Sequence, residues 1–511
     1  FALKNDIDAS QLDDFVPIGI VADTDSVIKD LGFSGTFNGR DYRIIGLTAE
    51  ASASNTGLFS TLHGTVKNLN IYASRFEGID TAGAVAGVNH GVIDNVSTLG
   101  NYVLATGSAN SQKVGTAVTA VHVGAAGGIA GVNKGTISHV TVADAVVAQG
   151  DGDSDDKVRV TAGGVTGINM DNGKDTNEIE QVEVHSAVTA SQSDDSYGLG
   201  GVAGLNLSEA SIAGAVNTGV THARYGDTIT ASSVGGIAGA NLGSISDSYN
   251  DGDITGGNYV GGIVGYNKYP TTKKAPNIVN AVNAGNVIVG AKTEETQPDY
   301  KYSGGLVGYN DGGVNNARNT GAIEGRDNVG GLVGYNAKGS TLTNLINGIA
   351  AEIVGLDNVG GIAGVNDGEI NATEMDLVNE GKVYGNQFVG GIAGDNSGTI
   401  ANVENAVLVL NITGLDAKYF GGIAGRNSGT IQGAVNKNAV TVEGGSFVGG
   451  IIGQNTGEGQ FNGVISNLGN VSGKDNVGGV IGENEYQGLL NNTSGERLSI
   501  SNSGSVEASD G

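Results

Sequence analysis

The sequence predicts an all-β protein, a parallel β-helix (β-solenoid) of about 14 three-sided coils with no substantial helix. A Gly-rich motif that ends in Asn recurs along the 511-residue chain, and its apolar residues alternate with small or polar ones, as in a strand. The chain holds 90 Gly but only 4 Pro, which fits strands that lie between two others and need their N–H groups. Glycine does not recur at every third residue, so collagen is excluded, and 39% hydrophobic residues argue against disorder.

The repeat reads V-G-G-I-[AV]-G-x-N, with a degenerate first copy at 56–59. We expect Ile263 and its equivalents to form an interior aliphatic column. The terminal Asn residues should form a ladder in which each side-chain amide bonds to the coils above and below. The ladder positions in the regular part of the chain are Asn241, Asn267, Asn310, Asn336, Asn366, Asn396, Asn427, Asn455 and Asn484.

Two weaker segments follow each copy of the motif. One reads G-x-I-x-[ND], as at 243–247, and the other reads N-x-G-x-[IV]-x-G, as at 319–325. Each carries an apolar residue between small or polar ones, which indicates a further strand. Three short strands separated by Gly and Asn corners would complete one turn, because both residues tolerate left-handed backbone angles.

The units GGIVGYN at 261–267, GGLVGYN at 304–310 and GGIAGDN at 390–396 resemble the GLUG repeat of bacterial filamentous-haemagglutinin-like adhesins and of some IgA-specific metallopeptidases. The stretch FSGTFNGRDYRIIGLT at 33–48 resembles the lead-in of such repeats. The resemblance covers nearly the whole chain. It implies export and a right-handed β-helix, and the spacing alone does not give the handedness.

The pattern divides the chain into three parts. Residues 1–50 are expected to be a lead-in or capping segment, 51–305 coils with loop insertions, and 306–511 regular coils that end without a polar cap. Neither an initiator Met nor a signal peptide opens the sequence, which therefore reads as an excerpt of a longer precursor.

The charge limits the partners. The formal net charge is −27, from 53 acidic and 26 basic residues, so nucleic acid and anionic membranes should be repelled. No apolar run is long enough to span a membrane. The composition, together with the absence of Cys, suits a secreted or bacterial cell-surface protein.

The residue between the last Gly and the Asn varies along the repeats, which predicts an outward position. It reads Val88, Val132, Ile168, Leu205, Ala240, Tyr266, Tyr309, Tyr335, Val365, Asp395, Arg426, Gln454 and Glu483. Stacked tyrosines beside polar insertions suit the faces of sugar rings, although stacked Tyr can also simply stabilise the outside of a sheet. The candidate ligand-binding residues are Tyr266, Tyr309, Tyr335, Tyr269, Lys273, Tyr300 and Tyr302.

One acidic loop is a candidate calcium site. Asp151, Asp153, Asp155 and Asp156 provide the oxygen ligands that Ca²⁺ prefers, but the Gly and Glu of an EF-hand loop are missing. A solvated acidic loop explains the same residues. No other cofactor is expected.

Three functions remain open at this point. The first is a non-enzymatic structural and adhesive segment of an exported adhesin, a rigid rod that mediates attachment to cell surfaces, matrix or biofilm by binding glycan or a surface protein. The second is the non-catalytic stalk of a surface enzyme such as an IgA-type metallopeptidase, although HExxH is absent. The third is a polysaccharide-active β-helix enzyme, for which Asp247, Asp251, Asp253 and Arg318 are the nearest acid–base cluster.

Overall fold

The structure is a computed structural model whose backbone contacts form two compact units, Phe1–Gly257 and Asn258–Gly511, described here one at a time as unit 1 and unit 2. The described residues are 1–12, 15–22, 28–50, 54–107, 112–114, 121–149, 158–174, 178–191, 196–225, 228–229, 233–269, 277–289, 302–373, 377–412, 416–457, 459–485 and 498–509.

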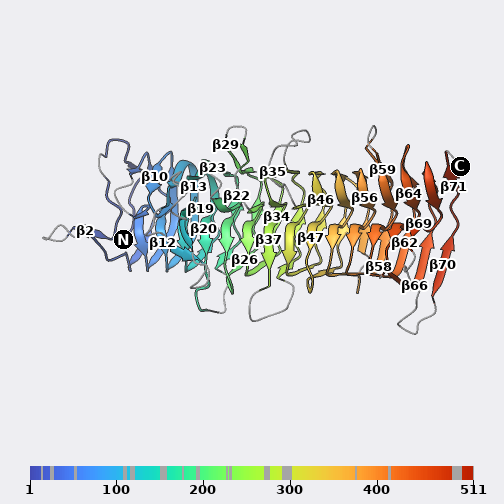
Figure 1. Ribbon diagram of the computed structural model, residues 1–511. Helices are drawn as coiled ribbons and strands as arrows, with labels where there is room; N and C mark the ends of the chain where they lie inside the picture. The colour runs from blue at the N-terminus through green and yellow to red at the C-terminus, as the bar shows by residue number, and fades with distance from the viewer. Residues whose placement is uncertain are drawn as a thin grey trace. The chain divides into compact units, whose positions relative to one another are not determined.

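Each unit is a parallel β-helix with three faces, as the sequence predicts, and Figure 1 shows its strands in successive stacked coils. One coil of unit 2 illustrates the path of the chain. The strands β46 (Asp327–Gly330) and β47 (Val333–Asn336) form two faces. The third face is built from three short strands, β48 (Thr341–Thr343), β49 (Ile346–Asn347) and β50 (Glu352–Val354).

The repeat motif is therefore not one strand, as expected, but two. Its Gly pair, such as Gly330 and Gly331, turns the chain from the first face to the second. The reason is steric, because a Cβ on Gly330 would lie 1.9 Å from the carbonyl oxygen of Val333. Only glycine permits so tight a corner.

The strands of the first two faces alternate along the chain. In unit 1 they are β7 (Asn55–Thr56), β8 (Phe59–Leu62), β11 (Thr81–Gly83), β12 (Ala86–Asn89), β15 (Val121–Gly127), β16 (Ala130–Asn133), β19 (Val158–Gly163), β20 (Thr166–Asn169), β24 (Ser196–Gly200), β25 (Ala203–Asn206), β31 (Ser233–Gly235) and β32 (Ala238–Asn241). In unit 2 they are β36 (Tyr259–Gly261), β37 (Val264–Lys268), β41 (Tyr302–Gly304), β42 (Val307–Asp311), β46, β47, β51 (Asp357–Gly360), β52 (Ala363–Asn366), β56 (Gln387–Gly390), β57 (Ala393–Asn396), β60 (Lys418–Gly421), β61 (Ala424–Asn427), β64 (Ser446–Gly449), β65 (Ile452–Asn455), β68 (Asp475–Gly478) and β69 (Ile481–Asn484).

The predicted Asn ladder is confirmed in both units. Successive motif Asn side chains donate Nδ2–H to the Oδ1 of the next, for example Asn336 to Asn366 and Asn366 to Asn396, both at 2.8 Å. In unit 1 the same bond joins Asn206 to Asn241 at 2.8 Å. These side chains are fully buried. Their hydrogen bonds to one another replace the hydrogen bonds to water that they lose on burial.

A second buried Asn ladder runs along the third face of unit 2. It includes Asn347, which donates to Asn379 at 2.8 Å, and Asn379, which donates to Asn405 at 3.0 Å. The N-x-G segment contains this Asn, which was expected only at a corner of the coil. The ladder members in unit 2 are Asn283, Asn319, Asn347, Asn379, Asn405, Asn436, Asn467 and Asn502.

The second Gly of the Gly pair lies against this second ladder. A Cβ on Gly361 would lie 2.2 Å from Nδ2 of Asn379, and one on Gly391 would lie 2.3 Å from Cγ of Asn405. The two features therefore depend on each other across the thin interior. In unit 1, Asn217 donates to Asn250 at 2.7 Å in the same ladder, and Val184 takes the place of Asn217 in the preceding coil and faces Gly164.

The aliphatic column is also confirmed. Ile263 and its equivalents Leu306, Leu332, Ile362 and Ile392 in unit 2, together with Ile237 in unit 1, have no exposed surface.

The expectation that the variable motif position points outward is correct only in part. In unit 2 these side chains are partly exposed, but in unit 1 Val132, Ile168 and Leu205 are completely buried. Leu205 packs beside Gly198, which belongs to the five-residue strand β24. The first-face strands β15, β19 and β24, which have seven, six and five residues, therefore cover a position that the three- and four-residue strands of unit 2 leave open.

The N-terminal segment completes the first coils of unit 1. Its strands β1 (Ile7–Asp8) and β4 (Thr36–Asn38) pair in parallel with β5 (Arg43–Ile45) and β9 (Thr65–Tyr72), respectively.

A buried carboxyl interrupts a polar stack in unit 1. Asn101 accepts the N–H of Ser74 at 2.8 Å, and Asp144 accepts that of Asn101 at 3.0 Å. Burial raises the pKa of the Asp144 carboxyl to about 6, an effect that hydrogen bonds with Thr98 and Asn101 offset only in part. The amide of Asn101 also donates to the carbonyl of Ile71 at 2.9 Å, a bond that a carboxylate at 144 cannot reproduce.

We predict that Gly361→Ala destabilises unit 2 by roughly 1–3 kcal/mol, because its Cβ would overlap Asn379 and the Gly391 carbonyl. The matched control is Gly348→Ala, whose Cβ would come no closer than 3.1 Å to its neighbours, which are the end of the Arg318 side chain, the Asn319 carbonyl oxygen and Cγ2 of Thr320. Denaturant unfolding measures both, and equal costs would contradict the close approach.

We predict that Asp144→Asn stabilises the protein at pH 7 but not at pH 4. The folded pKa of about 6 lies above the usual value of 3.8, so the folded state binds more protons than the unfolded state between these values, and the stability linked to this proton is lost as pH rises through 6. The advantage of the Asn variant should therefore grow from pH 4 to pH 7, by roughly 1–3 kcal/mol. A difference in unfolding free energy that is constant over this pH range contradicts the assignment.

Candidate ligand-binding surface

Five tyrosines form a cluster on the outside of unit 2. Tyr259 and Tyr302 lie in register on the first face, while Tyr266, Tyr309 and Tyr335 lie in register on the second. The alternation of the second-face strands positions Tyr266 and Tyr309, because the next residues, Asn267 and Asn310, point inward and are fully buried. All five rings are partly exposed.

The rings of each row stack on one another. Tyr259 and Tyr302 are parallel within 1° with centroids 5.6 Å apart, and Tyr309 and Tyr335 are within 12° at 5.0 Å. Carbon atoms in contact are about 3.5–4.0 Å apart, so parallel rings at these separations must be slid past one another to touch, which leaves part of each face at the surface.

The two rows meet edge to face. Tyr302 contacts Tyr309 with centroids 5.5 Å apart and planes at 78°, and it contacts Tyr335 at 5.4 Å and 67°. Each such contact fixes the orientation of both rings. The cluster is thus a preformed apolar platform rather than a set of independent side chains.

Polar groups border the platform. The Tyr335 hydroxyl donates to Asp367, which also accepts a hydrogen bond from Ser397 at 2.5 Å. Burial, and then the Asp367 hydrogen bond, raise the pKa of the Tyr335 phenol above its usual range, so it remains a hydrogen-bond donor at neutral pH. On the other side, Lys268 and Asp311 form an ion pair at 3.8 Å.

The other predicted binding residues do not all join this cluster. Tyr302 is part of it, but Tyr269 follows β37 and its hydroxyl lies 3.2 Å from that of Thr341 on the third face. Lys273 and Tyr300 lie outside the described residues, as do Asp151, Asp153, Asp155 and Asp156 of the candidate calcium loop.

The acid–base cluster considered for an enzyme is divided between the units. Asp251 and Asp253 are exposed in unit 1, and Asp247 occupies a left-handed corner there with φ of 51°. Arg318 belongs to β44 (Arg318–Asn319) of unit 2. Among the described residues, no group of three His, Asp or Glu side chains could hold a metal ion.

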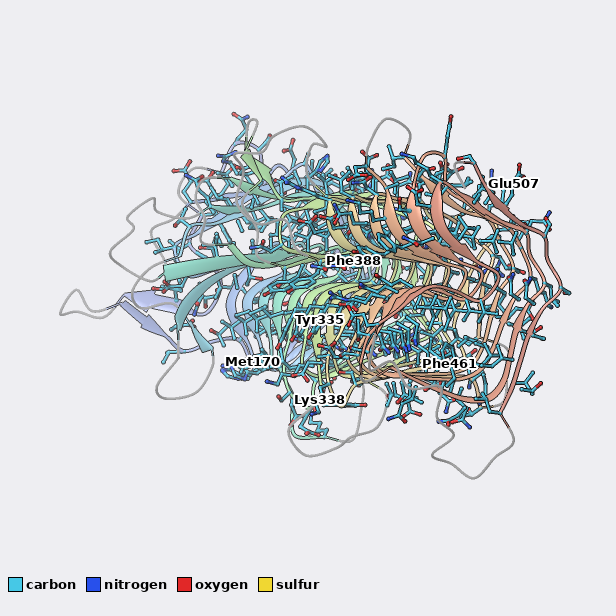
Figure 2. All side chains as sticks on the ribbon, turned by 45° about the vertical axis from the view of Figure 1, so that its right-hand side comes forward. Met170, Tyr335, Lys338, Phe388, Phe461 and Glu507 are labelled. Atoms are coloured by element: carbon cyan, nitrogen blue, oxygen red, sulfur yellow. The ribbon has the colours of Figure 1, made fainter. Side chains whose placement is uncertain are left out.

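A second aromatic row lies on the first face of unit 2, at the position of Tyr259 and Tyr302 in later coils. Phe388, Tyr419 and Phe447 stack with successive centroids 5.0 Å apart and planes within 4° and 17°. Sequence reasoning missed this row because it followed the position before Asn and not the one before V-G-G. Reading down that second position would have revealed it. Figure 2 labels Phe388 in this row and Tyr335 in the tyrosine cluster.

Charged side chains of the second face lie beside the second row. The Arg426 guanidinium lies over the Phe388 ring, 4.6 Å from its centroid, and Nε of Arg426 donates to Asp395 at 2.9 Å. Hydrogen bonding to Asp395 is the main cause that raises the pKa of Arg426. In the next coil Gln454 donates to Glu483 at 2.9 Å.

Within the part of the chain that the structure describes, there is no helix with the length and hydrophobicity of a membrane span.

Comparisons with known proteins found one family motif and one similar solved structure. The GLUG motif matches residues 230–255. A solved structure from Bacteroides ovatus, described as a "putative immunoglobulin A1 protease", is similar with 20% sequence identity over 59% of this chain and 73% of that chain, at a TM-score of 0.35. No curated protein matches the chain.

Proposed function

We propose that this GLUG-motif solenoid is the ligand-binding segment of an exported bacterial adhesin, and that the tyrosine cluster of unit 2 binds neutral carbohydrate. The observation that carries the proposal is the preformed platform of five partly exposed rings. Aromatic rings with a polar border bind the apolar faces of sugars while nearby side chains bond to the hydroxyls.

The border supplies such groups. Asp311, Asp367 and Lys268 provide acceptors and a donor beside the rings. The net charge of −27 disfavours acidic polysaccharides and phosphate, so an uncharged glycan is the ligand class that the surface suits best. The proposal assigns binding only and requires no bond-breaking step.

Export is part of the same proposal. Attachment to glycans outside the cell requires a secreted or surface location, which fits the acidic composition, the absence of Cys and the GLUG motif. Host and matrix glycans, including those of a biofilm, are the proposed partners.

We predict that the triple substitution Tyr266→Ser, Tyr309→Ser and Tyr335→Ser weakens binding to neutral polysaccharide at least tenfold, because it removes one complete row of the platform. The probes are immobilised β-1,4-glucan, β-1,3-glucan, mannan and galactan, and surface plasmon resonance measures binding.

The matched control replaces three partly exposed tyrosines of unit 1, Tyr42, Tyr72 and Tyr249, with Ser. The control should bind as the parent does, and both variants should keep the parent's β-sheet circular dichroism. Unchanged binding by the first variant, or no binding of any probe by the parent, contradicts the proposal.

A further inference from the structure

The second aromatic row contains three residues in a backbone conformation that side chains rarely adopt. Phe388, Tyr419 and Phe447 have φ values of 51°, 65° and 61°. In this left-handed region a Cβ crowds the following carbonyl oxygen, and bulky residues are true outliers there. Three successive coils thus each carry an aromatic residue in this unfavourable backbone conformation.

In other coils of unit 2, Asn occupies the equivalent position with the same left-handed backbone conformation. Asn328, Asn358 and Asn476 occupy the equivalent position with φ values of 51° to 52°. Asn tolerates this conformation, and the Asn358 amide donates to Asn328 at 2.9 Å, so it also bonds along the stack. The fold therefore does not need aromatic side chains at this position.

The three rings also contribute little to the interior. They are partly exposed, whereas the next residue in each strand, Val389, Phe420 or Val448, is fully buried. Backbone strain at a surface position points to a role outside the fold itself.

We propose that Phe388, Tyr419 and Phe447, with Arg426 and Asp395 at their side, form a second carbohydrate subsite that binds the same neutral polysaccharide chain as the tyrosine cluster. This inference rests on the proposed function. Both platforms lie along the same two faces of unit 2, parallel to the stacking direction. A polymer that runs in this direction contacts both.

The spacing sets the length of the ligand. From Tyr259 to Phe447 the first face advances by six strands, or about 29 Å at about 4.8 Å per strand, whereas the tyrosine cluster alone covers two, or about 10 Å. The polar coil that carries Asn358 and Val365 lies between the platforms. Short oligosaccharides therefore reach one platform, and only longer ones reach both.

The test uses Phe388→Asn, Tyr419→Asn and Phe447→Asn combined, since Asn is the residue that the fold itself places at the equivalent positions. Isothermal titration calorimetry measures oligosaccharides of increasing length from the polysaccharide that the parent binds. In the parent, affinity should rise until the chain spans both platforms. In the Asn variant it should stop rising early, with at least tenfold weaker binding of long chains and unchanged binding of short ones.

The other outcomes separate the two proposals. Unchanged affinity of the Asn variant for long chains overturns the second subsite and leaves the tyrosine cluster as the binding site. Equal loss for short and long chains overturns the two-platform arrangement. If the parent binds no polysaccharide of the panel, both proposals fail.

Discussion

The hydrogen bonds between buried Asn side chains are the interaction on which the rest of this solenoid depends. In unit 2 two such ladders run along the stack, one at the end of each motif and one on the third face, and their members have no exposed surface over most of their length. An amide has both a donor and an acceptor, so it can bond to the coil above and the coil below at once. Removing one member leaves a buried donor and a buried acceptor without partners, which costs more than the bonds contribute.

The ladders also determine where glycine is required. The interior is so thin that the second Gly of the corner touches the amide of the second ladder, as Gly361 touches Asn379. The Gly before the variable residue meets a different obstacle: a Cβ on Gly425 would lie 2.3 Å from the carbonyl carbon of Phe388 in the preceding coil. Much of the motif is thus determined by the interior and by contacts between coils. The outward positions are left free to vary, and it is there that the tyrosines and the second aromatic row occur.

The architecture could be predicted from the sequence because it repeats. The Asn spacing gave the first ladder, and the Ile263 position gave the aliphatic column, since each recurs at a fixed offset from the glycines. Two features could not be obtained in this way. Burial of Val132, Ile168 and Leu205 depends on the length of the strands beside them, which the motif does not contain. The strain at Phe388 and its two neighbours in the row depends on their positive φ values. The sequence does not reveal these values, because the equivalent residue in other coils is Asn, which is common at many kinds of position. The sequence predicted the tyrosine cluster except for Tyr259. This residue lies seven positions before Tyr266, and only the turn at the Gly corner brings the two rings together.

The contributions of a ladder residue and of an outward residue to the free energy of unfolding can be compared within a single strand. Val365 and Asn366 are adjacent in β52, one partly exposed and the other fully buried in the ladder. The free energy of unfolding should be compared, by denaturant titration, for Val365→Ala and Asn366→Ala. The account predicts a loss of roughly 2–4 kcal/mol for the Asn variant and less than about 1 kcal/mol for the Val variant. Equal losses, or a larger loss for Val365→Ala, would contradict the claim that the ladder holds the coils together.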